Sequence, residues 1–143
     1  MSTFNLAGLL RLRHLQQDLA AGELSAARAR LDETGMQQQR ARAALGSGAT
    51  DVTSTEHLYA IAAGRASLRS TLSDLDALCA EQQLVANDAG AAFGAARTKS
   101  VTLEKLERKH AERVTAQELA AEQLVLDELA TTTWHRSSEG SES

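Results

Sequence analysis

Histidine is the residue of this chain best suited to hold a metal ion, and the four histidines lie far apart. They are His14, His57, His110 and His135. A metal site on a helix places two ligands one turn apart, at positions i and i+4, and no pair of these histidines has that spacing. We therefore predict surface or seam histidines and no metal site.

Covalent chemistry has equally little support. The single cysteine, Cys79, falls in a helical seam, where a small buried apolar side chain is expected in place of a nucleophile. One cysteine allows no intramolecular disulfide, which suits a reducing compartment. Gly46 and Gly48 lack the Lys-Ser/Thr of a phosphate-binding loop and indicate a linker. Nothing in a slender helical hairpin would enclose a substrate. We predict no enzyme, no cofactor and no small-molecule substrate.

A basic stretch near the middle of the second half could in principle bind phosphate. It contains Lys99, Lys105, Arg108, Lys109 and Arg113. Glu104, Glu107 and Glu112 interleave with these cations, so a solvated, self-neutralised helix face is favoured. The net charge of −4 agrees, and no nucleic-acid partner is expected. Trp134, the only tryptophan, fits an interface anchor or a fraying terminus equally well.

The composition predicts long helices. The 143 residues include no proline and only two Phe, one Tyr and one Trp, and the apolar content is mostly Leu and Ala. A globular core normally draws on aromatic side chains, whereas this composition is typical of coiled coils. One internal proline would cost a helix about 3 kcal/mol. We predict an all-α fold, an antiparallel coiled-coil hairpin of two long helices.

The first helix is expected over about 5–45. Leu12 and Leu19 are seven residues apart, and so are Leu24 and Leu31, but the two pairs do not share one heptad frame. The drift favours a broad apolar face over a strict zipper.

A polar turn over 46–54 separates the helices, and Thr53 with Glu56 has the spacing of a capping box. The second helix is expected over about 55–133. Its opening seam steps by threes and fours, as a coiled coil requires. The positions are Leu58, Ile61, Arg65, Leu68, Leu72, Leu75, Cys79 and Gln82. The seam resumes at Leu103, Leu106, His110, Val114, Gln117, Ala121 and Leu124.

Two further features concern the second helix. Asn87, Asp88, Gly90 and Gly94 lower helix propensity, so a kink or hinge could occur near the two glycines. Residues 1–136 are predicted to form a single domain, and 137–143 has the composition of a disordered tail. Because the helices differ in length, the end of the second must stay unpaired, fold back at Gly90/Gly94, or meet a partner.

The N-terminus does not resemble a signal peptide, because the run Leu6–Leu12 is short and is interrupted by Gly8 and Arg11. No apolar run approaches the roughly 18 residues that a membrane span needs. These observations favour a cytoplasmic protein.

Both ends of the sequence resemble the flagellar FliJ family, a coiled-coil component of the type III export apparatus. The N-terminal match consists of Phe4, Leu6, Leu10, Leu12, Arg13, Glu23, Leu24, Ala26, Ala27, Arg28 and Leu31. The C-terminal match consists of Glu104, Lys105, Leu106, Glu107, Arg108, Glu122, Gln123, Leu126, Asp127, Glu128, Leu129 and Ala130. The middle, 46–96, is similar only in being helical and rich in Leu and Ala.

The resemblance implies a hairpin similar to the stalk subunit of rotary ATPases. It also implies binding to the hexameric export ATPase, promotion of its assembly and activity, and contact with the export-gate membrane protein and with substrate chaperones. The protein would then associate peripherally with the inner face of the membrane at the flagellar base, in a process linked to motility and chemotaxis. The alternatives are an adaptor or chaperone of another secretion or division complex, and a structural homo-oligomer.

Two sets of residues are expected to carry these contacts. The ATPase-binding set is Leu6, Leu10, Arg11, Arg13, Glu122, Gln123, Asp127 and Glu128. The export-gate set is Leu58, Tyr59, Ile61 and Leu68.

Overall fold

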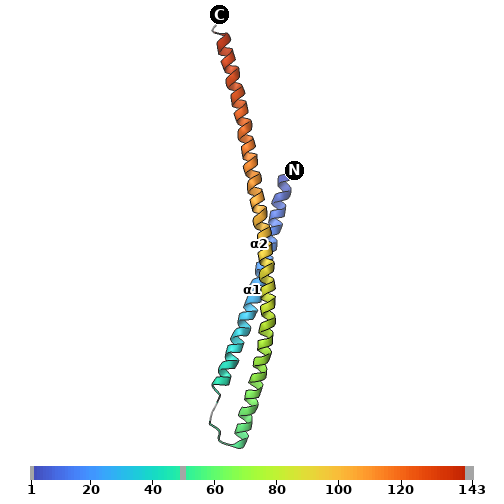
Figure 1. Ribbon diagram of the computed structural model, residues 1–143, viewed down its shortest axis with the longest axis vertical. Helices are drawn as coiled ribbons and strands as arrows, with labels where there is room; N and C mark the ends of the chain where they lie inside the picture. The colour runs from blue at the N-terminus through green and yellow to red at the C-terminus, as the bar shows by residue number, and fades with distance from the viewer. Residues whose placement is uncertain (1, 49–50, 141–143) are drawn as a thin grey trace. The chain divides into compact units, whose positions relative to one another are not determined.

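The computed structural model describes residues 2–48 and 51–140, with side chains from Leu6 onward, and this part of the chain is two helices joined by a turn (Figure 1). Helix α1 is Ser2–Gly46 and helix α2 is Thr55–Glu139. The two helices pack against each other, which confirms the predicted all-α hairpin. Residues 11–99 form one compact unit, and 1–10 with 100–143 form a second.

The packed face of α1 is a strict heptad seam. Twelve buried and half-buried residues alternate steps of three and four, as a coiled coil requires, and Ala21 and Gly35 are half-buried beside them. The twelve are Leu6, Leu10, Arg13, Gln17, Ala20, Leu24, Ala27, Leu31, Thr34, Gln38, Ala41 and Leu45. The predicted drift is therefore wrong, because Leu12 and Leu19 are 48% and 62% exposed and lie outside the seam. Leucines alone gave a misleading frame, since alanine, threonine and glutamine fill many seam positions.

The seam of α2 follows the predicted frame in its central part. Its buried and half-buried members between Leu68 and Val114 are Leu68, Leu72, Leu75, Cys79, Gln82, Ala86, Ala89, Phe93, Ala96, Ser100, Leu103, His110 and Val114. Six predicted members are wrong, because they are exposed: Leu58, Arg65, Leu106, Gln117, Ala121 and Leu124. Leu106 is one residue short of position 107, where the alternating steps that reach Leu103 from Ser100 place the next seam residue.

Polar contacts fix the register of the hairpin within residues 11–99. Gln38 Nε2 donates to Asp76 Oδ1 at 2.6 Å, and Arg42 Nη2 lies 3.5 Å from the same oxygen. Further along, Leu24 lies against Gly90, where a methyl group added to the glycine would stand 3.9 Å from Leu24 Cδ1. From the Gln38–Asp76 pair to the Leu24–Gly90 pair, the residue number decreases on α1 and increases on α2. The two helices are therefore antiparallel.

Arg65 was predicted to occupy the seam, and the structure gives it another role. The residue is exposed, and its Nη2 donates to the main-chain oxygen of Leu45 at 3.3 Å. The last carbonyls of a helix lack partners within the helix and carry the negative end of its dipole. The last turn of α1 has no basic side chain of its own. Arg65 from α2 therefore supplies the positive charge that offsets the negative end of the dipole.

Helix α2 runs without interruption through Gly90 and Gly94. No described glycine has a positive φ, and the Thr98 hydroxyl donates to the main-chain oxygen of Gly94 at 2.9 Å. The helix is therefore intact at the predicted hinge, and bending there stays a prediction.

The sequence predicted that the second helix ends at about residue 133, whereas in the structure α2 continues to Glu139. The hydroxyls of Thr131, Thr132 and Thr133 donate to carbonyls four residues back at 2.7–2.8 Å. Ser137 and Ser138 bond carbonyls three residues back. Side chains expected to compete with the helix thus bond to its own backbone. The part of the predicted disordered tail over 137–139 is helical, and 141–143 lies outside the described residues.

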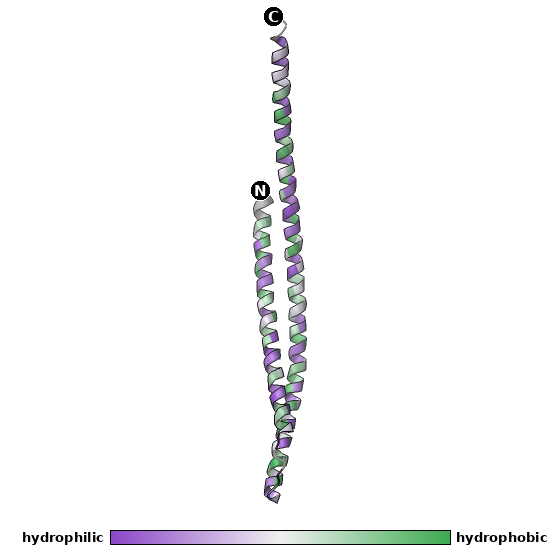
Figure 2. Cartoon of the chain, turned by 90° about the vertical axis from the view of Figure 1, so that its left-hand side faces the viewer, coloured by the Kyte–Doolittle hydropathy of each residue, from purple (hydrophilic) through white to green (hydrophobic). Residues whose placement is uncertain are grey.

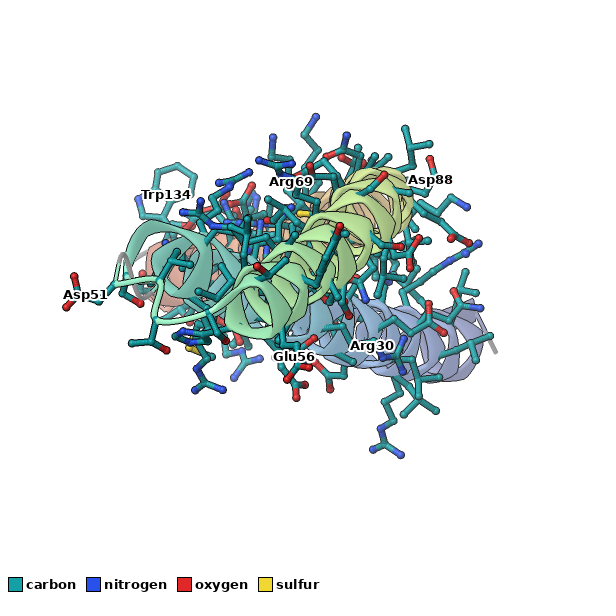
Figure 3. The ribbon with its side chains drawn as sticks, turned by 90° about the horizontal axis from the view of Figure 1, so that it is seen from below. Arg30, Asp51, Glu56, Arg69, Asp88 and Trp134 are labelled. Atoms are coloured by element: carbon teal, nitrogen blue, oxygen red, sulfur yellow. The ribbon has the colours of Figure 1, made fainter. Side chains whose placement is uncertain are left out.

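The predicted capping box is displaced by one residue. Ser54 Oγ accepts from the main-chain N–H of His57 at 3.1 Å, which makes Ser54 the N-cap. His57 Nδ1 accepts from the N–H of Thr53 at 3.3 Å, so histidine takes the part expected of Glu56. Viewed along the hairpin, Asp51 and Glu56 point outward from this end (Figure 3).

This cap gives the first testable prediction. Replacing Ser54 by alanine removes the acceptor of an otherwise unpaired N–H, so we expect the free energy of unfolding to fall by about 1 kcal/mol. Thr53→Ala is the control and should lower it by much less. Urea unfolding followed by circular dichroism measures both, and equal losses would show that Ser54 is not the cap.

Candidate functional site

The residues suited to chemistry lie apart in the structure. No group of three or more His, Cys, Asp or Glu in the described part of the chain could hold a metal ion. Cys79 is half-buried in the seam of α2, as expected for a packing residue. What the molecule offers a ligand is therefore helix surface, and the candidate site is a set of partner-binding surfaces.

Polar side chains inside the seam weaken the hairpin. Ser100 is only 1% exposed, and its hydroxyl has no hydrogen-bond partner among the described residues. Gln82 Oε1 and His110 Nε2 are also buried without a partner there. Burying an unsatisfied polar group costs about 1–3 kcal/mol, so these positions lower the stability that leucines would provide.

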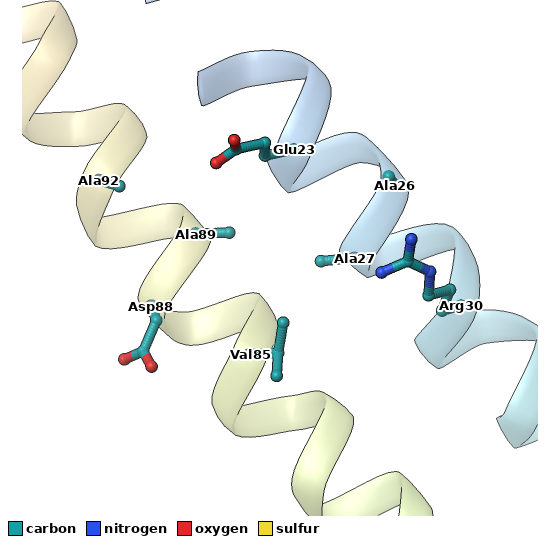
Figure 4. A pocket seen from close by; sticks show the side chains of 8 residues that line it. All are labelled: Glu23, Ala26, Ala27, Arg30, Val85, Asp88, Ala89 and Ala92. Atoms are coloured by element: carbon teal, nitrogen blue, oxygen red, sulfur yellow. The ribbon is translucent and has the colours of Figure 1, made fainter. Parts of the chain in front are cut away.

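A shallow groove runs along one side of the hairpin body. It has a volume of about 460 Å³ and lies where alanines leave room between the helices (Figure 4). Ala27 of α1 faces Val85 and Ala89 of α2, while Glu23 and Arg30 stand on the α1 side. The mixed charges and the openness suit a passing helix better than an enclosed small molecule.

The N-terminal half of the ATPase-binding set lies on α1. Leu6 and Leu10 are half-buried in its seam, and Arg11 is exposed. Leu6 lines a groove of about 320 Å³ together with His110 and Val114 of α2. The leucines therefore hold the end of the hairpin together, and of these three residues only Arg11 is free to meet a partner.

Arg13 also belongs to this half of the set. It is half-buried in the seam of α1, and its Nη1 donates to Gln16 Oε1 at 3.1 Å.

The C-terminal half of the set lies past the last residue of α2 that packs against α1. From Thr115 to Gly140 every residue is exposed, and we call this segment the overhang. Gln123 Nε2 donates to Asp127 Oδ1 at 3.3 Å, a bond within one helix. Figure 2 shows hydrophobic residues alternating with hydrophilic ones along this last part of α2. The end of the second helix was expected to stay unpaired, to fold back or to meet a partner. Among the described residues it stays unpaired.

The two halves of the ATPase-binding set are consequently not joined by a folded-back helix. An arrangement in which the overhang lies beside the first helix would bring Arg11 and Arg13 next to Asp127 and Glu128. Helix α2 remains one helix to Glu139, so the overhang does not fold back at Gly90/Gly94. Which residues of this set contact the ATPase stays a prediction.

The export-gate set divides between the surface and the seam. Leu58 and Tyr59 are 50% and 71% exposed in the first turns of α2. Ile61 and Leu68 are half-buried on the packed face. Only the first two can serve a partner without opening the hairpin.

One surface was missed by the sequence reasoning. Leu12, Leu15 and Leu19 are 48%, 56% and 62% exposed, and they lie on α1 outside its seam. Leu12 and Leu19 do not share the heptad frame of Leu24 and Leu31. This mismatch indicates a second apolar face on α1, not the predicted drift of a single face.

The fold defines a class of protein: a helical hairpin whose longer helix ends in an exposed overhang. The family model described as flagellar FliJ protein matches residues 1–139, so the chain belongs to that family and is a component of the flagellar export apparatus. The match includes the middle of the chain, where the sequence resemblance was poorest. No curated protein and no solved structure matches the chain. No helix in the described part is long and apolar enough to cross a membrane.

The buried hydroxyl in the seam gives the second prediction. Ser100→Ala removes an unsatisfied polar group and improves helix propensity, so the free energy of unfolding should rise. The exposed Ser25→Ala has only the propensity gain of about 0.5 kcal/mol. We expect the Ser100 variant to exceed that control by about 1 kcal/mol in urea unfolding. Equal gains would mean that the hydroxyl is hydrated in solution.

Proposed function

We propose that this chain is a non-enzymatic subunit of the flagellar export apparatus that binds and stimulates the hexameric export ATPase. It would also link the ATPase to the export-gate membrane protein and to substrate chaperones. Membership of the flagellar FliJ protein family supports this role. The structural observation that supports it is the overhang, the segment from Thr115 to Gly140, which is helical to Glu139 and whose residues are all exposed in the described part of the chain.

A single helix is the right size for the centre of a ring. With side chains it is about 10–12 Å across, and the roughly 25 residues of the overhang reach about 37 Å. Its exposed leucines could rest against apolar ring surfaces, while its carboxylates pair with basic loops. Exposed ion pairs contribute only about 0–1 kcal/mol each, so such contacts can break and re-form as the ring changes state.

We assign the gate contact to the first turns of α2. Leu58 and Tyr59 follow directly after the cap at Ser54, and both are exposed. An exposed aromatic ring beside a leucine is the composition typical of interface anchors. With the ATPase on the overhang and the gate at the turn, one chain could contact both partners together. Such contacts would hold the protein at the inner face of the membrane.

Charge reversal on the overhang tests the ATPase contact. Asp127→Lys with Glu128→Lys should reduce stimulation of ATP hydrolysis by the purified export ATPase. The loss should deepen as salt is lowered, because screening weakens the repulsion that the lysines introduce. Asp74→Lys with Glu81→Lys, two exposed carboxylates of the hairpin body, is the control. Full stimulation by the overhang variant at low salt, with helicity unchanged, would refute this assignment.

A separate substitution tests the gate contact. Tyr59→Ala should reduce pull-down of the export-gate protein several-fold, because it removes an exposed ring without disturbing the seam. Tyr59→Phe should retain most of the binding, and Leu84→Ala, equally exposed elsewhere on α2, should retain all of it. Unchanged capture by the Tyr59→Ala variant would remove this residue from the interface.

A further inference from the structure

Helix α1 carries a second apolar face on the side away from α2. Leu12, Leu15 and Leu19 follow each other at steps of three and four, and Gly22, Ala26 and Ala29 continue the same series. These positions alternate between the two heptad places farthest from the seam. All six are exposed, and none carries a charge. We call them the outer stripe.

The overhang carries the other large apolar surface of the chain. Its exposed side chains are Leu119, Leu124, Val125, Leu126, Leu129 and Trp134, each between 56% and 71% exposed. Single exposed leucines are ordinary in a folded protein, but six large apolar side chains exposed between Leu119 and Trp134 favour an interaction surface.

The two surfaces match in length and in charge. The outer stripe spans about 27 Å of helix, and the run from Leu119 to Trp134 spans about 24 Å. Between residues 11 and 30 there are four arginines and two acidic residues, a net charge of +2. The overhang has five acidic residues and one arginine, a net charge of −4. Opposite charges of this kind favour association and disfavour pairing of either surface with itself.

The two surfaces also match in shape when they run parallel. With Leu119 beside Leu12, equal steps along the two helices bring Trp134 to the end of the outer stripe, where Gly22, Ala26 and Ala29 are small. A large ring then meets a shallow helix surface, and leucines meet leucines at the other end. Helix α2 continues as one helix to Glu139, so it has no turn at which the overhang could fold back.

We propose that the outer stripe binds the overhang of a second copy of this chain, and that the two copies do so reciprocally. A reciprocal exchange is a closed two-fold arrangement, so it ends at a dimer and does not form a filament. This inference does not depend on the proposed function, because it concerns the purified chain alone.

The unmodified protein gives the first test. Sedimentation at increasing concentration should show a monomer passing into a dimer, with the dimer weakened as salt is raised. Trp134, the only tryptophan and 67% exposed, reports on the same event. Its emission should shift to shorter wavelength over the concentration range in which the dimer forms.

Matched leucine substitutions locate the interface. Leu19→Gln changes a stripe residue that is 62% exposed, and Leu84→Gln changes a residue of α2 that is 66% exposed. Each stripe substitution occurs twice in a reciprocal dimer, so Leu19→Gln should raise the dimer dissociation constant at least tenfold. Leu84→Gln should leave it unchanged, and circular dichroism confirms that both variants are folded.

Three results would overturn the proposal. They are a monomer at every concentration, a dimer that Leu19→Gln leaves intact, and a dimer whose formation does not change the emission of Trp134. The last would place the contact away from the overhang.

Discussion

The constraint on which the whole structure depends is the unequal length of its two helices. Helix α1 has 45 residues and α2 has 85, and a helix satisfies its backbone hydrogen bonds without a neighbour. Its apolar side chains do need one, since apolar surface left in water forfeits about 25 cal/mol per Å². Pairing can therefore be complete only as far as α1 extends. The end of α2 remains exposed, and that exposed end is the surface to which the proposed partner contacts are assigned.

The paired part is itself held loosely. Thr34, Gln82 and Ser100 occupy seam positions where leucine or isoleucine would pack more tightly. The register is then specified by polar contacts at the surface, in particular those of Gln38 and Arg42 with Asp76. Such contacts contribute little energy but exclude other alignments of the seam.

Much of the fold could be predicted from composition and periodicity, because 3–4 spacing and the absence of proline act locally. The frame of α1 could not, since alanine, glutamine and threonine fill seam positions that leucine would have marked. The cap was misplaced by one residue because the choice between Thr53 and Ser54 depends on which hydroxyl reaches the N–H of His57. The exposure of Leu12 and Leu19 depends on where α2 lies, which a single helix pattern does not reveal.

The overhang remains helical for a reason that also bears on binding. A short isolated helix is marginal in water because its first turn is costly to nucleate. The overhang avoids that step, since it continues a helix already formed over the hairpin, and it is rich in Ala, Leu, Glu and Gln, which extend a helix readily. A partner then meets a surface that is already ordered and loses little conformational entropy in binding it. The hairpin thus acts as the nucleus of the helix that the molecule presents.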